Sequence, residues 1–370
     1  MRIGIDARMI DWSGIGRYTE SLITGIKEFV TGIEPVLFCN QSNSHRISDS
    51  ITFKRHYINT SVFSLDAPIR LAGKLKPCEL ELYHSPHFVV PSGKATYPIV
   101  VTIHDLIPLI IKRTMPNALY RRYYYLINRL ACRKATKIIA PSQSTKNDIE
   151  RILGVPGDKI EVIYEGVHSM FRKTSEKQVG EIKEKFAIKG GYIFALGNQK
   201  PNKGIEYLID AFYKLMSGQG LKHELVLIGS PSDKFKGVRS RITRYGLEHK
   251  VRFIGKVTDD ELIALYNGAS VFVFPSLYEG FGLPPLEAMA CEVPVVASNK
   301  SSMPEVVGDA ALTVDPCQVD ELANAIVGAI EDENLRSRLV GHGLKRVRDF
   351  SLEKFTKETV MVYKQALEKT

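Results

Sequence analysis

The sequence predicts an α/β protein made of two doubly wound domains, each built on a parallel sheet. Short apolar runs rich in Val and Ile alternate with longer segments of helical period, which is the pattern of βαβ units. A length of 370 residues exceeds one ordinary core and suits two domains. A hydrophobic content of 44% with 25% charged residues is typical of a globular chain that can bury both cores.

The expected elements fall into two series, separated by a polar, lysine-rich stretch that holds one short helix near Glu181–Phe186. In the first series we expect strands at Arg2–Asp6, Val36–Cys39, Leu80–His84, Ile99–Ile103, Lys137–Ala140 and Glu161–Tyr164, with helices at Arg17–Phe29, Pro116–Arg133 and Ser142–Leu153. In the second we expect strands at Tyr192–Leu196, Leu225–Ile228, Val251–Ile254, Val271–Pro275 and Val293–Ala297, with helices at Gly204–Met216, Asp259–Tyr266 and Pro284–Ala290. These series predict an N-terminal domain at residues 1–167 and a second domain that begins at residue 168.

The N-terminus and the cysteines indicate the cellular setting. The opening MRIGIDAR carries charges and lacks the apolar centre of a secretory signal, so we expect a cytoplasmic protein. The longest apolar stretch, residues 97–111, is interrupted by His104, Asp105 and prolines, and it is shorter than the roughly 20 residues that span a bilayer. The cysteines are scattered without a C-x-x-C pair, which argues against a disulfide framework or zinc site and predicts buried thiols.

Residues 112–137 form a basic, tyrosine-rich segment without an acidic residue, in a chain of net charge +9. Such a segment fits peripheral contact with an anionic membrane at the inner membrane face better than nucleic acid, which we do not expect as a partner. A helix with one solvated basic face and one packed aromatic face explains the same pattern equally well.

The loop at residues 11–17 follows the first expected strand and leads into a helix. Ligands of doubly wound sheets bind at the carboxyl ends of strands. Gly14 and Gly16 therefore lie where backbone N–H groups and the helix dipole favour a phosphate, although a purely structural turn would look the same. The full G-x-G-x-x-G fingerprint is absent because Thr19 stands at its last position, which disfavours a dinucleotide-dependent oxidoreductase.

The loop at residues 197–204 has the same place in the second series. It carries Asn198, Lys200 and Lys203 ahead of a helix. A lysine there can neutralise a diphosphate as a point charge, whereas the alternative is a solvated turn.

The segment from Phe274 to Met289 is the most informative one. A strand ends, glycines allow a ligand close to the backbone, and prolines begin a helix whose N–H groups face the loop. Glu279 lies in the loop and Glu287 about one turn into the helix, so both carboxylates can accept hydrogen bonds from paired sugar or ribose hydroxyls.

This segment resembles the donor site of glycosyltransferase family 4, the group 1 glycosyltransferases. The resemblance rests on the E-x7-E spacing of Glu279 and Glu287, the preceding FPS, the following EAMACEVPVVAS and the later MPEV. It extends over nearly the whole chain through GIGRYT, VTIHDLIPL, GNQKPNKG and the terminal FSLEKFTKETVMVYKQAL. The resemblance implies retaining enzymes of the GT-B fold, with two Rossmann-like domains facing a cleft. It also implies an acceptor domain at residues 1–167, a donor domain at 168–350, and a last helix at 351–370 that crosses back to the first domain.

The resemblance also implies roles for individual residues. Glu279 would contact the donor sugar and Glu287 the ribose, while Lys203 would hold the diphosphate. Backbone amides at Gly14, Gly16, Phe281, Gly282 and Leu283 would assist at the diphosphate, and the pair His104 and Asp105 would lie beside the transferred sugar. The arginine that many members carry near Asn198 is missing, and Lys200 is the candidate to replace it.

The resemblance implies transfer of a hexose, with mannose from GDP-mannose as the best expectation, to a glycan or lipid-linked glycan in cell-surface polysaccharide synthesis. UDP-sugars and dTDP-rhamnose stay open as donors. A GT-B-type epimerase or phosphorylase and a non-catalytic nucleotide-sugar binder are the alternatives. No cofactor or metal is expected, because Pro86 separates His84 from His87, and Thr258 with Glu261 predicts a capping box in place of an acidic metal motif.

Overall fold

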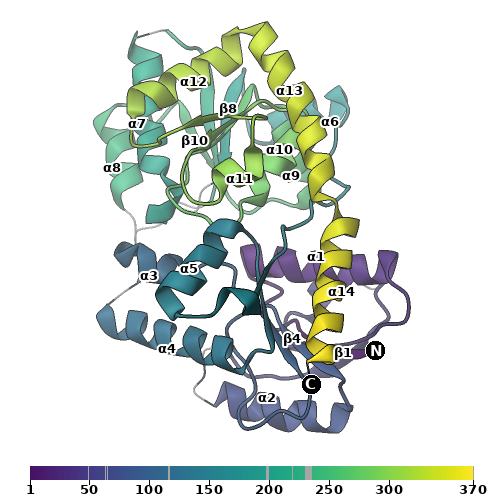
Figure 1. Cartoon of the computed structure of the whole chain (residues 1–370). Helices are drawn as coiled ribbons and strands as arrows, with labels where there is room; N and C mark the ends of the chain where they lie inside the picture. The colour runs from purple at the N-terminus through teal and green to yellow at the C-terminus, as the bar shows by residue number, and fades with distance from the viewer. Residues whose placement is uncertain are drawn as a thin grey trace. The chain divides into compact units, whose positions relative to one another are not determined.

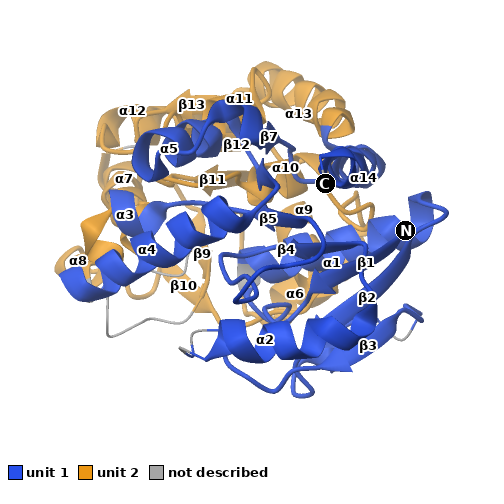
Figure 2. Ribbon diagram, turned by 60° about the horizontal axis from the view of Figure 1, so that its bottom comes forward, with its two compact units in different colours: residues 1–110, 115–166, 350–370 blue, residues 111–114, 167–349 orange. Residues whose placement is uncertain are grey.

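The computed structural model describes all residues except 49, 63, 65, 116, 197–199, 219, 230–235 and 370. The chain divides into two compact units, which Figure 2 shows in blue and orange. Unit 1 contains residues 1–110, 115–166 and 350–370, and unit 2 contains residues 111–114 and 167–349. The C-terminal helix thus belongs to the same unit as the N-terminal strand.

Unit 1 is built on a seven-stranded parallel sheet of order β3-β2-β1-β4-β5-β6-β7. Its strands are β1 Arg2–Asp6, β2 Glu34–Cys39, β3 Lys54–Tyr57, β4 Leu82–Ser85, β5 Ile99–Thr102, β6 Lys137–Ala140 and β7 Ile160–Val162. Its α-helices are α1 Ser13–Phe29, α2 Ala67–Leu75, α3 Ile107–Ile110, α4 Ala118–Lys134, α5 Gln143–Leu153 and α14 Leu352–Glu368. The strand order reverses between β1 and β4, which makes this the topological switch point of the sheet.

Unit 2 is built on a six-stranded parallel sheet of order β10-β9-β8-β11-β12-β13. Its strands are β8 Tyr192–Leu196, β9 Glu224–Ile228, β10 Val251–Ile254, β11 Val271–Phe274, β12 Val295–Ser298 and β13 Leu312–Val314. Its α-helices are α6 Glu176–Lys185, α7 Ile205–Gly218, α8 Lys236–Arg244, α9 Asp259–Asn267, α10 Leu283–Ala290, α11 Met303–Val307, α12 Val319–Glu331 and α13 Glu333–Val347, and the 3₁₀ turn η5 spans Pro201–Lys203. The switch point here lies between β8 and β11. Both sheets confirm the predicted fold class.

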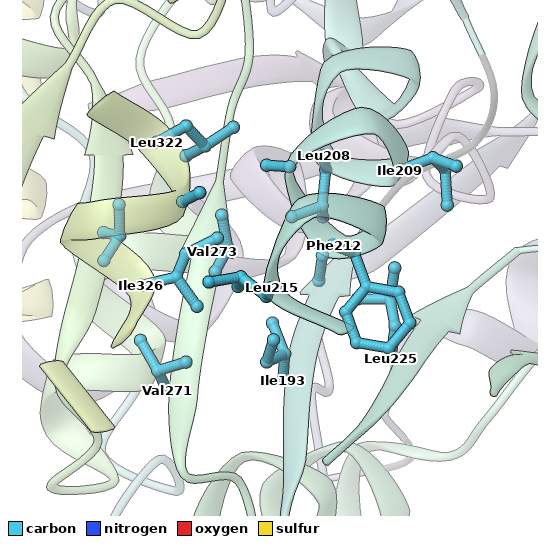
Figure 3. Close-up of a cluster of buried hydrophobic side chains, with 14 of the residues drawn as sticks. Ile193, Leu208, Ile209, Phe212, Leu215, Leu225, Val271, Val273, Leu322 and Ile326 are labelled. Carbon is cyan, nitrogen blue, oxygen red and sulfur yellow. The ribbon is translucent and has the colours of Figure 1, made fainter. Parts of the chain in front are cut away.

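In the core of unit 2, the apolar residues of α7 recur at helical spacing and face the sheet (Figure 3). Leu208, Phe212 and Leu215 recur along one face of α7 and pack against buried side chains of the sheet, including Ile193 and Val273. Each of the three is fully buried, and such burial contributes about 1.5–3 kcal/mol per side chain. The apolar face of α7 is therefore what fixes this helix on the sheet.

Helix α14 packs beside α1 in unit 1 (Figure 1). Tyr18 of α1 contacts the ring of Phe355, with ring centres 5.1 Å apart, and both belong to one buried cluster with Tyr363. Gly25 permits the close approach, because a Cβ at this position would collide with the hydroxyl of Thr356. The last helix thus completes the core that the first strand and helix begin.

Some predicted bounds differ from the structure for identifiable reasons. Helix α1 begins at Ser13, not Arg17, so Gly14 and Gly16 lie inside its first turn and not in a preceding loop. The sequence did not indicate β3, because this edge strand reads KRHY and has no apolar alternation. Cys317 is exposed, which corrects the expectation that all cysteines are buried. Within the described residues, no helix has both the length and the apolar character that crossing a bilayer requires.

Candidate functional site

Candidate residues from both units follow strands at or next to the two switch points. In unit 1, Gly14 follows β1 and His104 follows β5, two strands away across β4. In unit 2, Lys203 follows β8 and Glu279 follows β11, which are neighbours in the sheet. These are the positions where open α/β sheets bind ligands. Asn198 lies outside the described residues.

The centre of the unit 2 site is an ion pair between Lys203 and Glu279. Lys203 Nζ lies 2.7 Å from Glu279 Oε1, although the two residues are 76 positions apart in the chain. The ammonium also lies 5.3 Å from the centre of the Phe274 ring, a cation–π distance. Both side chains are mostly shielded from solvent, so each charge needs a partner there. Each side chain of the pair therefore neutralises the charge of the other.

The turn η5 is fastened to the loop after β11 by Asn202. The Leu277 N–H donates to the Asn202 carbonyl at 2.7 Å, and Asn202 Nδ2 donates to the Tyr278 carbonyl at 3.2 Å. Gly204 follows at φ +65°, and a Cβ there would collide with the carbonyl of Pro275. These contacts fix the backbone on both sides of Lys203. Nothing in the neighbouring sequence marks Asn202 as a support of the site, because its partners lie on a distant segment.

Two serines before α11 hold the loop that carries Glu279. Ser301 Oγ donates to the Glu279 carbonyl at 2.6 Å, and Ser302 Oγ donates to the carbonyls of Glu279 and Phe281 at 3.1 and 2.6 Å. Gly282 has φ +107°, and a Cβ on it would collide with the methyl group of Met303. The E-x7-E segment is thus shaped by the SSM sequence that follows β12. The two serines were not predicted as part of the site, because their acceptors lie about 20 residues earlier in the chain.

Helix α10 begins with few backbone donors. Pro284 and Pro285 follow Leu283 and carry no N–H, so among the first four backbone positions of this helix start only Gly282 and Leu283 carry a donor. Glu287 is only 6% exposed, and its Oε2 accepts a hydrogen bond from the Tyr266 hydroxyl at 3.0 Å. Its contact with a ribose stays a prediction. Lys200 is exposed at the N-terminal end of η5, and its replacement of the missing arginine also stays a prediction.

Gly14 and Gly16 of α1 differ in whether the surrounding protein leaves space for a side chain. The Gly16 N–H donates to the Trp12 carbonyl at 2.5 Å, and a Cβ on Gly16 would collide with the carbonyl of Ile10. Around Gly14, by contrast, an added Cβ would meet no described atom within 4 Å. Packing within the protein therefore accounts for Gly16 but not for Gly14, which leaves Gly14 as the better candidate for a close approach by a ligand.

His104 has an acceptor near each ring nitrogen. Nε2 lies 3.1 Å from the carbonyl of Pro86, and Nδ1 lies 3.6 Å from Glu165 Oε1. Because a carbonyl only accepts, Nε2 carries the proton of this hydrogen bond. The Tyr18 ring meets the His104 ring edge-on at 4.8 Å. Glu165 follows β7 and was missed by the sequence analysis, which had no signal to link it to His104.

Asp105 has a structural contact of its own. Its Oδ1 accepts a hydrogen bond from the Ile107 N–H at 2.9 Å at the start of α3, and its carbonyl accepts one from the Tyr124 hydroxyl at 3.2 Å. These bonds hold the backbone directly after His104. A catalytic role for Asp105 stays a prediction.

A buried polar cluster supports the turn that presents Pro86. Asp6 Oδ2 accepts from Arg8 at 2.6 Å and from the Tyr83 hydroxyl at 2.7 Å, and it lies 3.2 Å from His87 Nε2. His87 Nδ1 in turn accepts the Val89 N–H at 3.1 Å. Burial by itself would raise the pKa of Asp6, but the charges of Arg8 and then His87 outweigh it and hold this pKa well below its usual range. Asp6 is therefore a buried anion that orients His87.

His87 and His104 border a small cavity in unit 1. The cavity has a volume of about 40 Å³, and its lining includes Ile15, His87, Thr102, His104 and Asn128. A water molecule needs roughly 10–15 Å³ of cavity volume measured in this way. The cavity therefore has room for a few waters or for a single polar substituent of a ligand.

His84 lies in a separate chain of hydrogen bonds and not with His87. Its Nδ1 lies 2.7 Å from the Tyr363 hydroxyl, its Nε2 lies 2.9 Å from Thr102 Oγ1, and Thr102 Oγ1 lies 2.9 Å from the Tyr18 hydroxyl. Burial lowers the pKa of His84 to about 3, so the ring is neutral. Among the described residues, no group of three His, Cys, Asp or Glu side chains is arranged to hold a metal ion.

Solved structures share the two-sheet architecture. The Anabaena protein HepE in complex with UDP and glucose has a TM-score of 0.79 at 20% identity, and the match covers 99% of this chain and 100% of that one. A glycosyltransferase from Rickettsia africae has a TM-score of 0.78 at 19% identity, with 100% and 99% covered. The two switch-point sites thus lie on the GT-B fold of glycosyltransferases.

Sequence comparisons narrow this class. The model of Glycosyltransferase Family 4 matches residues 12–169, and that of Glycosyl transferases group 1 matches residues 178–346. The O-antigen chain mannosyltransferase B of Escherichia coli is 30% identical over 370 residues, covering 95% of this chain and 96% of that protein. The E. coli serotype-specific mannosyltransferase WbdA is 33% identical over 276 residues, which cover 72% of this chain and 34% of that longer protein. This chain belongs to the family 4, group 1 glycosyltransferases, and it is a hexosyltransferase.

Proposed function

We propose that this enzyme transfers mannose from GDP-mannose, with retention at the anomeric carbon, to a glycan or lipid-linked glycan in cell-surface polysaccharide synthesis. The names of the E. coli relatives support mannose as the sugar and a surface polysaccharide as the product. The main support for placing the donor site here is the pair of Lys203 and Glu279, which is shielded from solvent at the carboxyl ends of β8 and β11.

Donor binding would replace the ion pair with two new interactions. The diphosphate is the stronger anion for Lys203, and the sugar hydroxyls are donors for Glu279. Separation of the pair without a ligand would leave two poorly solvated charges, which is costly. The site would therefore open only when a ligand with an anionic group and neighbouring hydroxyls is present. A nucleotide sugar has both.

The same residues account for the leaving-group chemistry. The bond between the anomeric carbon and the diphosphate oxygen breaks, a bond from the acceptor oxygen forms on the same face, and the acceptor proton passes to the departing diphosphate. Negative charge grows on the diphosphate in this step, so Lys203 and the N–H groups of Gly282 and Leu283 would act where charge develops. In unit 1, Gly14 and His104 are proposed to act on the diphosphate and on the transferred sugar, as the family resemblance implies.

The proposal is tested by measuring the amount of glycoside formed and the amount of nucleoside diphosphate released in the same reaction. Purified enzyme with GDP-mannose and a mannoside acceptor should release one GDP for each mannoside formed, and NMR should show the α-anomer when the donor is α. Lys203→Ala should lower kcat/KM by about a hundredfold to a thousandfold while the protein stays folded. Lys214→Ala is the matched control, because it breaks an exposed ion pair with Asp320 on the outer face of α7.

Two other results would reject the proposal. Consumption of donor without a glycosylated product would identify an epimerase, and dependence on inorganic phosphate would identify a phosphorylase. A thermal-shift series with GDP-, UDP- and dTDP-sugars separates the donors, because a bound ligand raises the apparent melting temperature.

We also propose that α4 lies against an anionic membrane surface. Leu119, Leu126 and Leu130 are 74%, 51% and 50% exposed along one face of this helix, and the exposed Arg122 and Arg129 lie between them in sequence. Apolar side chains that enter the interface beside arginines that pair with lipid phosphates are typical of a helix lying on a membrane.

Vesicle sedimentation tests the membrane contact. The enzyme should sediment with vesicles that contain phosphatidylglycerol and not with pure phosphatidylcholine, and the double variant Leu126→Glu, Leu130→Glu should stay in the supernatant. Met361→Glu changes an equally exposed apolar residue on α14 and should behave like the wild type. Equal sedimentation of the double variant would reject α4 as the contact.

A further inference from the structure

An open pocket of about 600 Å³ lies at the carboxyl ends of β2 and β3 in unit 1. Its lining consists of two short segments, each directly after or close to the end of its strand: Asn40, Gln41, Ser42, Asn59, Thr60 and Ser61. In the sheet order β3-β2-β1-β4-β5, the pocket is on the same edge as Gly14 but on the side of β1 away from His104. The proposed donor site and transfer step do not involve this pocket.

The two walls of the pocket are held by hydrogen bonds. The Gln41 N–H donates to Asn59 Oδ1 at 3.0 Å, which joins the segment after β2 to the segment after β3. Asn40 Nδ2 donates to the Arg8 carbonyl at 3.2 Å, and the neighbouring Asn43 Nδ2 contacts both this carbonyl and Asp11 Oδ1, at 2.9 and 3.3 Å. The pocket is thus bonded directly to the loop that leads from β1 into α1.

The lining defines the chemistry of a ligand. Its described residues supply three carboxamides and three hydroxyls, and none of these residues is charged, aromatic or aliphatic. Most small-molecule pockets are lined mainly by apolar groups, so this wall is poorly suited to an apolar ligand. Because none of the described lining residues is a cation, the wall is poorly suited to a phosphate or nucleotide, which would seek Lys or Arg. Carboxamides offer a donor and an acceptor side by side, which matches the neighbouring hydroxyls of a sugar ring.

We infer that this pocket binds sugar residues of the acceptor glycan that precede the residue receiving the new hexose. The inference rests on the proposed function and names the substrate class more closely: an oligosaccharide that lies along the carboxyl edge of the unit 1 sheet, from β1 towards β3. A single sugar acceptor would reach the transfer site without filling this pocket. Longer acceptors gain hydrogen bonds here, each contributing a factor of about three to ten in affinity.

Acceptor length is the variable that tests the inference. The wild-type enzyme is assayed with GDP-mannose and α-linked acceptors from methyl mannoside to mannotetraose, and KM should fall as the acceptor lengthens. Gln41→Ala removes an exposed side chain and leaves the bond from its own N–H intact, so it should raise KM for mannotetraose about threefold to tenfold. Its kcat and its KM for methyl mannoside should stay unchanged. Asn59→Ala should have the same or a larger effect, because it also removes the bond between the two walls.

Asn334→Ala is the matched control, an exposed asparagine on α13 of unit 2, and it should behave like the wild type. If transfer is measurable but KM for mannotetraose is unchanged in both Gln41→Ala and Asn59→Ala, the pocket inference is wrong and the proposed function stands. If GDP-mannose yields no glycoside with any acceptor, the proposed function fails. The pocket is then judged by NMR titration of the whole protein with mannotetraose. Shifts of the side-chain amide signals of Gln41 and Asn59 support it, and unmoved signals overturn it.

Discussion

His87 Nε2 lies 3.2 Å from Asp6 Oδ2 inside unit 1, and neither side chain is exposed to solvent. The same carboxylate holds Arg8, so the loss of its charge would leave a buried guanidinium without its counter-ion. Asp6→Asn should lower the free energy of unfolding by about 3–5 kcal/mol, the usual effect of breaking a buried ion pair. Urea unfolding monitored by circular dichroism measures this.

The control for Asp6 is Asp66→Asn, which removes the charge from an exposed pair with Arg70 and should leave the urea midpoint almost unchanged. If Asp6→Asn were as stable as this control, the buried cluster would have no role in holding the turn at Pro86.

The two glycines at the start of α1 should respond differently to alanine. Gly16→Ala forces a Cβ onto the Ile10 carbonyl and should destabilise the protein by about 1–3 kcal/mol, seen as a lower melting temperature. Gly14→Ala has space for its Cβ, so the melting temperature should hold while KM for the nucleotide sugar rises. An unchanged KM in Gly14→Ala would remove this glycine from the donor site.

Glu165 should act on the reaction through His104. Glu165→Gln keeps the size of the side chain but removes the charge 3.6 Å from His104 Nδ1, so the imidazole loses a partner that fixes its orientation. We expect kcat to fall by up to about a hundredfold with little change in donor KM, since a misplaced group affects the reacting geometry more than binding. Glu161→Gln on β7, which breaks the pair with Lys137, is the control. A drop in melting temperature without a change in kcat would make Glu165 purely structural.

Stability should decrease in mild acid because of the buried histidines. Burial lowers the pKa of His84 to about 3 and also lowers that of His87, where the Asp6 charge acts in the opposite direction. An unfolded histidine titrates near pH 6.5, so below this pH the unfolded chain binds protons that the folded chain does not. The free energy of unfolding should therefore fall by about 1.4 kcal/mol per pH unit through His84 as the pH drops from about 6 towards 4, and His87 acts in the same direction. The pH dependence of the urea midpoint measures this.

His84→Gln provides the comparison for the acid effect. The substitution costs stability at every pH, because the bonds to Tyr363 and Thr102 are altered. Its pH dependence should nevertheless be shallower than that of the wild type. An identical slope would assign the acid effect to other groups.

Features that depend on a few neighbouring residues could be predicted from the sequence. The strands Arg2–Asp6, Lys137–Ala140, Tyr192–Leu196 and Val251–Ile254 have the predicted bounds. The capping box of Thr258 and Glu261 also agrees with the prediction. Each of these features is set by periodicity or by a hydrogen bond that spans three residues. All the residues that determine it are therefore close together in the sequence.

The polar edge strand and the supports of the site could not be predicted in this way. The strand β3 has no apolar alternation, and only its pairing with β2 defines it. Glu165, Asn202, Ser301 and Ser302 have polar side chains typical of any loop. Their partners lie on other strands, so nothing in their own neighbourhood in the sequence marked them.

The sequence by itself determined the α/β class, the two series of elements and the order of the loops that carry Gly14, Lys203 and Glu279, because periodicity and glycine or proline chemistry are local. The tertiary structure decided which of these residues meet. Lys203 and Glu279 form a pair because β8 and β11 are neighbours in the sheet, although the chain between them first builds β9 and β10. Strand order is set by the burial of whole helix and sheet faces, a property of the assembled core that no single segment contains.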